Sequence, residues 1–237
     1  MTRLAAPAIC LVTDRRLVAP DARTLAREIL ELERWLDEAL EADLDLIQLR
    51  ERDLEARVLL EVSARLVARR GNRRPRIVIN DRTDVALASG AGGVHLRSDG
   101  PPVPAVRSLT GASLLIGRSI HSDLEARQHD AADYLLFGAV FKVKAPEQGR
   151  RWPAQGLDAL VRAVRASRAP VLAIGGVTLD NASAVREAGA AGVAAIGLFL
   201  PPGRQSGALG PSRAAAALRS ALGSSGTVAN ARSPWNH

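Results

Sequence analysis

The chain has 237 residues, a formal net charge of +7 at pH 7 and a hydrophobic content of 47%, whereas aromatic residues make up only 3%. This length and aliphatic content are typical of one large domain with a sizeable core. The basic residues are spread along predicted helices that also carry acidic residues, with neither basic blocks nor clusters of aromatic residues. The composition therefore argues against a nucleic-acid partner.

The single cysteine, Cys10, excludes a disulfide framework and a thiolate metal cluster. No apolar run reaches the ~18 residues that a membrane-spanning helix needs. The first residues also lack the charged-then-apolar pattern of a signal peptide. We therefore expect a soluble cytoplasmic protein with no membrane partner.

Short apolar segments of strand length alternate with helical segments along the chain. We predict strands at Ala8–Val12, Leu44–Leu49, Ile77–Ile79, Gly93–Leu96, Leu114–Ser119, Tyr134–Phe137, Val171–Ile174 and Gly192–Ile196. We predict helices at Asp21–Ala42, Glu55–Arg70, Thr83–Ser89, Val103–Leu109, Asp123–His129, Gly156–Ala166, Leu179–Ala188 and Ser212–Leu222. Continuous apolar strands are typical of parallel sheets that are buried on both faces.

This order predicts an α/β fold, a single TIM (β/α)8 barrel, over residues 1–222. A doubly wound dinucleotide-binding sheet is disfavoured because no G-x-G-x-x-G motif follows the first strand. Residues 223–237 are polar, glycine-containing and without periodicity, so we expect a disordered tail there. Functional residues of such barrels lie at the C-terminal ends of the strands, so polar residues there are candidates for the site.

Glycine-bearing loops follow the seventh and eighth strands, with Gly175 and Gly176 in the first and Ile196 and Gly197 in the second. Backbone amides at a helix N-terminus bind phosphate, and glycine leaves them accessible. We interpret the pair of loops as a phosphate site. The alternative for Gly175 and Gly176 is a tight strand-to-helix turn without a ligand.

Three polar residues, Gln48, Arg50 and Arg52, end the second strand at alternate positions and therefore point to the same side. Two guanidinium groups in this place can bind a phosphate or diphosphate. Salt bridges to Glu51 or Asp53 are the alternative role for the arginines.

Asn80 and Asp81 end the third strand and can supply oxygen ligands for Mg²⁺ or hydrogen bonds to a polar ring. Asp81 fits equally well as the cap of the next helix. His95, from the fourth strand, is either a hydrogen-bonded core histidine or a catalytic residue. Ser119 and His121 end the fifth strand two residues apart, which makes His121 a candidate general acid/base unless it only caps a helix or lies in a loop.

Motifs at these positions together resemble the thiamine phosphate synthase/thiazole tautomerase (TenI) family over residues ~9–200. They are Cys10–Asp14, Gln48–Arg52, Ile79–Arg82, Gly93–Leu96, Ile116–Ser122, Asp133–Gly138 and Ala173–Val177. The resemblance implies a TIM barrel enzyme of thiamine biosynthesis with one of two activities. A synthase joins hydroxymethylpyrimidine diphosphate to a thiazole phosphate with Mg²⁺ and releases pyrophosphate. A tautomerase aromatises thiazole carboxylate phosphate by proton transfer without a metal.

The resemblance also implies roles for individual residues of this chain. In a synthase, the pyrimidine and its diphosphate would be held by Gln48, Arg50, Asn80 and Ser119. In either branch, the thiazole phosphate would be held by Gly175, Gly176, Ile196 and Gly197. The only two lysines of the chain, Lys142 and Lys144, fall in the loop that would cover a diphosphate, and Asp81 would be a metal ligand only in a synthase.

The chain departs from the synthase pattern at several of these positions. Arg52 stands in place of a lysine, and Gly100 stands in place of a metal-binding aspartate, with Asp99 one residue earlier. The run Lys142–Pro146 replaces a Thr-x-Thr-Lys run, and Gly197 replaces a serine. A reaction that expels pyrophosphate must neutralise developing charge, and the loss of one metal-binding carboxylate and two hydroxyl groups removes much of what would do so.

The departures favour a thiazole tautomerase without a cofactor, in which His121 moves the proton. A synthase with Mg²⁺ is the alternative enzyme, because both lysines remain in the loop after the sixth strand. A catalytically inactive barrel that binds thiamine intermediates is the alternative from another class. The expected partners are a small phosphorylated thiazole and, in a synthase, a pyrimidine diphosphate; a homo-oligomer is compatible with the sequence.

Overall fold

A computed structural model describes residues 4, 6–142 and 153–223 of the chain. Its parallel strands form a closed barrel in chain order, and β1 pairs with β8 to complete the ring. The strands are β1 (Ala8–Val12), β2 (Leu46–Leu49), β3 (Arg76–Asn80), β4 (Gly93–Leu96), β5 (Leu115–Ile120), β6 (Tyr134–Gly138), β7 (Val171–Ile174) and β8 (Gly192–Ala195). The predicted (β/α)8 barrel is therefore confirmed.

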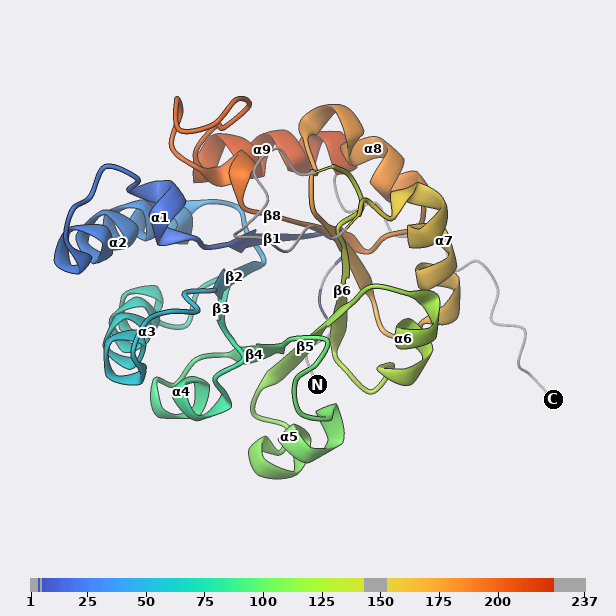
Figure 1. The fold of residues 1–237 in the computed structure, drawn as a ribbon, viewed down its shortest axis with the longest axis horizontal. Coiled ribbons are helices and arrows are strands. Elements are labelled where there is room, and N and C mark those ends of the chain that lie inside the picture. Colours follow the sequence, from blue (N-terminus) through green and yellow to red (C-terminus); the bar gives the residue numbers. More distant parts are fainter. Residues whose placement is uncertain (1–3, 5, 143–152, 224–237) are drawn as a thin grey trace.

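Helices surround the ring of strands (Figure 1). They are α1 (Arg15–Val18), α2 (Leu25–Glu41), α3 (Ala56–Arg70), α4 (Thr83–Ala88), α5 (Val103–Thr110), α6 (Asp123–Gln128), α7 (Gly156–Ala166), α8 (Leu179–Glu187), the 3₁₀ helix η1 (Gly197–Phe199) and α9 (Pro211–Leu222). Every predicted strand and helix is present; β1, β4, β7 and α7 have the predicted bounds, and the other elements differ at one or both ends. The short helices α1 and η1 were not predicted, because a single turn is too short to show apolar periodicity.

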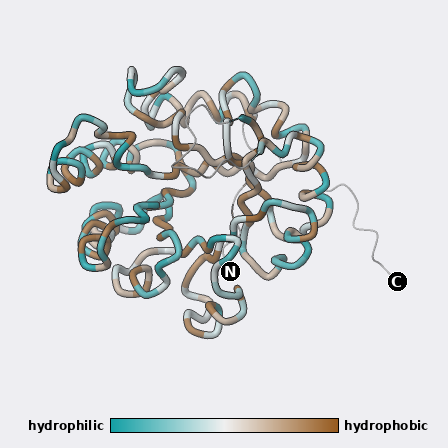
Figure 2. The backbone as a smooth tube through the Cα atoms, in the orientation of Figure 1, coloured by the Kyte–Doolittle hydropathy of each residue, from teal (hydrophilic) through white to brown (hydrophobic). Residues whose placement is uncertain are grey.

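The strands are apolar on both faces because two hydrophobic layers meet along them. One layer packs between the sheet and the surrounding helices. The other fills the inside of the barrel and contains Ala8, Cys10, Val12, Leu46, Val78, Leu115, Tyr134, Leu136, Leu172 and Ala194. Successive strand residues point alternately to these two layers. Figure 2 shows hydrophobic segments along the strands and alternation with hydrophilic residues along the helices.

Local signals in the sequence set several helix ends. The Thr24 side chain accepts from the backbone N–H of Arg27 and starts α2. The Thr178 backbone N–H donates to the Asn181 side chain at the start of α8, and Gly189 follows the end of that helix with φ of +87°. Among the described residues, no helix is long and apolar enough to cross a membrane. The predicted tail beyond Gly223 lies outside the described residues.

Candidate active site

Polar side chains from neighbouring strands form a hydrogen-bonded row at the C-terminal ends of β2 and β3. Gln48 is 2% exposed and Asn80 is 8% exposed. The Gln48 Nε2 donates to Asn80 Oδ1 at 2.9 Å, and Asn80 Nδ2 donates to Asp81 Oδ2 at 3.0 Å. The structure therefore brings together three of the predicted site residues.

The carboxylate of Asp81 fixes the orientation of both amides in this row. An ionised carboxylate only accepts hydrogen bonds, so Asn80 must present its NH₂ group to Asp81 and its oxygen to Gln48. Gln48 must then present its own NH₂ group to Asn80. Its oxygen Oε1 is left buried without a hydrogen-bond partner among the described residues. A buried acceptor of this kind is costly unless a ligand supplies an N–H or O–H donor.

Asp81 does not cap α4; its carboxylate binds Arg97 instead. Oδ1 accepts from the backbone N–H of Arg97 at 2.9 Å, and Oδ2 lies 2.9 Å from Arg97 Nε. The same Nε lies 3.4 Å from Asp99 Oδ1. Asp81 has φ of +60°, an uncommon backbone conformation for a residue other than glycine. Two carboxylates thus approach one cationic group beside the amide row.

This donor set suits Mg²⁺, which proteins bind through one or two carboxylates while waters and substrate phosphates complete the shell. Asp81 and Asp99 would hold the ion, provided that the half-exposed Arg97 side chain moves aside. Among the described residues, no group of three or more His, Cys, Asp or Glu side chains is arranged to bind a metal. Waters and substrate oxygens would therefore have to complete the site.

The loop that carries Asp99 is held by a buried arginine, Arg118, from β5. The Arg118 guanidinium donates to the backbone oxygens of Ser98, Gly100 and Pro101, at 2.8, 3.2 and 2.5 Å. Only 4% of Arg118 is exposed, and burial lowers its pKa. The loop places the Asp99 carboxylate near Asp81. Gly100 occupies the position at which the family resemblance predicts aspartate.

The segment after β2 is held by a buried carboxylate that the sequence did not reveal. Thr13 Oγ1 donates to Glu51 Oε1 at 2.6 Å and accepts from the backbone N–H of Arg50 at 2.9 Å. Glu51 also accepts from the backbone N–H of Arg15 at 3.1 Å. Glu51 is 4% exposed. It therefore links the loops after β1 and β2 and fixes the backbone from which Arg50 extends.

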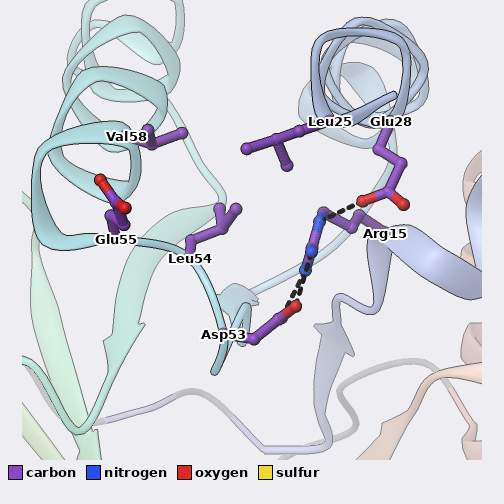
Figure 3. Close-up of a pocket in the computed structure, with 7 residues that line it drawn as sticks. All are labelled: Arg15, Leu25, Glu28, Asp53, Leu54, Glu55 and Val58. Atoms are coloured by element: carbon purple, nitrogen blue, oxygen red, sulfur yellow. Dashed lines mark hydrogen bonds and ion pairs between the residues drawn. The ribbon is translucent and has the colours of Figure 1, made fainter. Parts of the chain in front are cut away.

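The Arg15 guanidinium lies between carboxylates, as Figure 3 shows for Glu28 and Asp53. It lies 2.6 Å from Glu28, 2.6 Å from Asp53 and 3.2 Å from Glu51. Burial raises the pKa of Glu51 to about 7, against the hydrogen bonds from Thr13 and Arg15. The Arg15 hydrogen bond lowers the pKa of Asp53 to about 2. Glu51 and Asp53, which the sequence offered as alternative salt-bridge partners of Arg50 or Arg52, both bind Arg15.

A cavity of about 420 Å³ lies beside Arg15, between the starts of α2 and α3 (Figure 3). Its lining residues are Arg15, Leu25, Glu28, Asp53, Leu54, Glu55 and Val58. They come from helices and loops, and none of the predicted site residues is among them. We therefore do not assign this cavity to the active site.

Gly175 and Gly176, after β7, have positive φ of +95° and +67°. A Cβ on Gly175 would lie 2.5 Å from the Cβ of Ala139, and one on Gly176 would lie 2.8 Å from the carbonyl oxygen of Lys142. This close approach accounts for both glycines without a ligand, so phosphate binding stays a prediction. The same approach places the backbone of Lys142 beside the β7 loop, whereas Lys144 lies outside the described residues.

The side chain of Gln205, which the sequence did not indicate, lies against the loop after β8. Ile196 precedes η1, and Gly197 is its first residue. A Cβ on Gly197 would lie 2.6 Å from Gln205 Nε2. The Gln205 amide therefore lies against Gly197. Because β7 pairs with β8, the two glycine-bearing loops are neighbours.

Ser119 and His121 both lie at the end of β5 and are partly buried. Ser119 Oγ is 2.9 Å from His95 Nε2. His121 Nδ1 donates to the backbone oxygen of Gly138 at 2.5 Å. A carbonyl oxygen only accepts, so the neutral His121 ring carries its hydrogen on Nδ1 and its lone pair on Nε2. His95 is buried inside the barrel, and burial lowers its pKa to about 3.

The closed ring of parallel strands and the polar residues at its C-terminal end define a (β/α)8 barrel enzyme. Residues 10–199 match the family described as "Thiamine monophosphate synthase". The chain belongs to this family, as the resemblance of its motifs predicted.

Similar proteins carry the same kind of name. The thiamine-phosphate synthase of Anaeromyxobacter dehalogenans is 40% identical over 74% of this chain and 76% of its own length. The thiamine-phosphate synthase of Syntrophomonas wolfei is 35% identical over 80% of this chain and 87% of its own. The thiamine phosphate pyrophosphorylase structure from Pyrococcus furiosus superposes with a TM-score of 0.72 at 30% identity, over 91% of this chain and 95% of that one. These names support the synthase alternative and give the tautomerase no support.

Proposed function

We propose that the protein is a thiamine-phosphate synthase, which joins a pyrimidine diphosphate to a thiazole phosphate and releases pyrophosphate. The observation that carries this proposal is the buried, unpartnered oxygen of Gln48 at the end of the Gln48–Asn80–Asp81 row. A pyrimidine that carries an N–H or O–H group would supply the donor that this oxygen lacks. A tautomerase, which takes only a phosphorylated thiazole, gives no reason for such a second polar region opposite the glycine-bearing loops.

The sequence argument against a synthase was the loss of a metal-binding aspartate at Gly100 together with two hydroxyl groups. For the aspartate, the proposal is supported by Asp99, which approaches the same Arg97 nitrogen as Asp81 does. When bound there, Mg²⁺ would supply positive charge to the diphosphate. Two protein carboxylates plus diphosphate oxygens would make an ordinary Mg²⁺ shell.

The residues of the chain would divide the work between binding and charge neutralisation. Gln48 and Asn80 would orient the pyrimidine ring by hydrogen bonds. Arg50, Arg52 and Lys142 would face the diphosphate and stabilise the negative charge that develops on the leaving pyrophosphate. The backbone of Gly175, Gly176 and Gly197 would anchor the thiazole phosphate. Holding both substrates in one barrel mouth converts their encounter into a step within one complex.

The test is an assay of the purified protein with both precursors and Mg²⁺, in which thiamine phosphate and pyrophosphate are measured together. We expect equimolar formation of both products and loss of both on addition of EDTA. Gln48→Ala should raise the KM for the pyrimidine diphosphate more than the KM for the thiazole phosphate. Absence of thiamine phosphate from an intact, folded preparation would contradict the proposal.

A second candidate, the tautomerase, is favoured by one observation, the geometry of His121. Its Nδ1–H is directed at Gly138 O, which holds the imidazole at the end of β5, where a general acid/base would act. The same preparation should therefore be given thiazole carboxylate phosphate without metal, beside a His121→Ala variant. Aromatic product that depends on His121 would establish this activity. If neither reaction occurs but a phosphorylated thiazole raises the melting temperature, the protein is a binding protein.

A further inference from the structure

A histidine, a glycine and a tyrosine lie side by side on adjacent strands inside the barrel. His95 of β4 is in register with Gly117 of β5, and Gly117 is in register with Tyr134 of β6. A Cβ on Gly117 would lie 2.1 Å from Cζ of Tyr134. The missing side chain therefore lets the tyrosine ring cross β5 and reach the histidine, with 5.6 Å between the ring centroids.

The Tyr134 hydroxyl is completely buried and has one hydrogen-bond partner among the described residues, His95 Nδ1, at 3.2 Å. The core cluster that contains Tyr134 inside the barrel consists of apolar side chains such as Leu115, Leu136 and Leu172, together with the thiol of Cys10. A buried hydroxyl hydrogen needs an acceptor, and Nδ1 is the acceptor within reach. The His95 lone pair must then be on Nδ1.

His95 is a neutral imidazole, which carries a single N–H. Its Nδ1 accepts the hydrogen of the buried Tyr134 hydroxyl and therefore does not carry a hydrogen of its own. With the lone pair on Nδ1, the hydrogen is on Nε2. That hydrogen points to Ser119 Oγ, which lies 2.9 Å away.

We propose that Tyr134 and His95 are positioning residues that make Ser119 a hydrogen-bond donor to the ligand. Ser119 accepts from His95, so its own hydrogen is directed elsewhere. Ser119 is partly exposed, whereas His95 and Tyr134 are buried beneath it. The ligand atom that meets the Ser119 hydrogen in this proposal is an acceptor, such as a pyrimidine ring nitrogen or a phosphate oxygen. Only the identity of this ligand rests on the proposed function.

The first test needs no ligand and no activity. In ¹⁵N-labelled protein at pH 7, the His95 ring should show a protonated Nε2 and an unprotonated Nδ1, with its signals assigned by their loss in His95→Gln. In Tyr134→Phe, some Nδ1-protonated ring should appear, because the hydroxyl no longer requires an acceptor. Leu136→Val is the matched control, since it alters packing beside Ser119 without removing a hydrogen bond. A wild-type ring protonated on Nδ1 would overturn the proposal.

The second test measures the Kd of the pyrimidine diphosphate alone, which cannot react without its partner. Tyr134→Phe and Ser119→Ala should each weaken binding about 5-fold to 10-fold, as expected for one ligand hydrogen bond. The double variant should bind no more weakly than Ser119→Ala, because Tyr134 acts only through Ser119. Equal effects of Tyr134→Phe in both backgrounds would mean a general packing role and would contradict the proposal. If the NMR result holds but the diphosphate does not bind even the wild type, the proposed function is what fails.

Discussion

The two sides of the barrel mouth are built from different parts of the chain. Around β2 to β5 the polar atoms belong to side chains, Gln48, Asn80, Asp81 and Ser119, which are hydrogen-bonded to one another or to buried neighbours. Around β7 and β8 the site consists of backbone, with glycines where a Cβ would clash. The first side can distinguish ligands by their donors and acceptors. In the proposed function, the second would bind a phosphate through backbone groups and would therefore accept any phosphorylated molecule whose remaining parts fit.

The largest expected effect is on catalysis, and it comes from removing an arginine on the β2 to β5 side of the mouth, where the polar atoms belong to side chains. Arg50→Ala should lower kcat/KM for thiamine phosphate formation about 100-fold, because a positioned charge that stabilises a leaving group is worth this much. Steady-state kinetics with both substrates would measure it. Arg57→Ala, which removes the same charge from an exposed position of α3, should have little effect. Equal losses in both variants would mean that only net charge matters.

On the backbone side, Gly176→Ala should destabilise the fold by about 3 kcal/mol, because a Cβ there adds overpacking to an unfavourable φ. The contact to be crowded is with the Lys142 carbonyl oxygen, at 2.8 Å from the new atom. Gly203→Ala is the matched control: it also has positive φ, but no atom lies within 4 Å. Urea unfolding should show a loss of about 1 kcal/mol in the control. If both variants lose the same free energy of unfolding, the close approach of the loops after β6 and β7 is refuted.

The buried carboxylate behind Arg50 predicts a pH dependence of stability. With its folded pKa raised from 4.5 to about 7, Glu51 binds a proton more tightly in the folded than in the unfolded chain. Its contribution to the free energy of unfolding is therefore fully present below about pH 4.5 and is lost as the pH rises to about 7.

The free energy of unfolding of the wild type minus that of Glu51→Gln should fall by about 2 kcal/mol between pH 5 and pH 8. Gln keeps the shape but does not titrate in this range. Denaturant unfolding of both proteins at each pH would measure the difference. A difference that rises with pH would show that Arg15 keeps Glu51 ionised in the folded protein, and that the carboxylate is stabilised rather than penalised by its site.

The barrel was predictable because both of its apolar layers leave a signal in the sequence, as uninterrupted strands and as periodic helices. The site was predictable in part, since barrel geometry alone selects residues such as Gln48 and Asn80. Other features depend on distant contacts. Nothing near Glu51 marks it as buried, because Thr13 and Arg15 come from another loop. The link between Tyr134 and His95 depends on a strand register that places Gly117 between them.

Asp99 also shows how a distant contact escapes the sequence. Its position argued that the metal-binding carboxylate was lost, because Gly100 stands where aspartate was expected. The folded loop argues that the carboxylate is kept, because it brings Asp99 to the Arg97 group that binds Asp81. The smallest expected effect tests it. In Arg97→Gln, the guanidinium that binds Asp81 and Asp99 is gone, so Mn²⁺ used as a probe should bind about 3-fold more tightly, as expected for release of one exposed ion pair. Arg82→Gln removes the same charge from a pair with Asp84 and is the control. Isothermal titration of both variants would measure the difference. Equal affinities would mean that the two carboxylates do not share a cation, and the side-chain half of the mouth would then have to neutralise a diphosphate with its arginines and Lys142 alone.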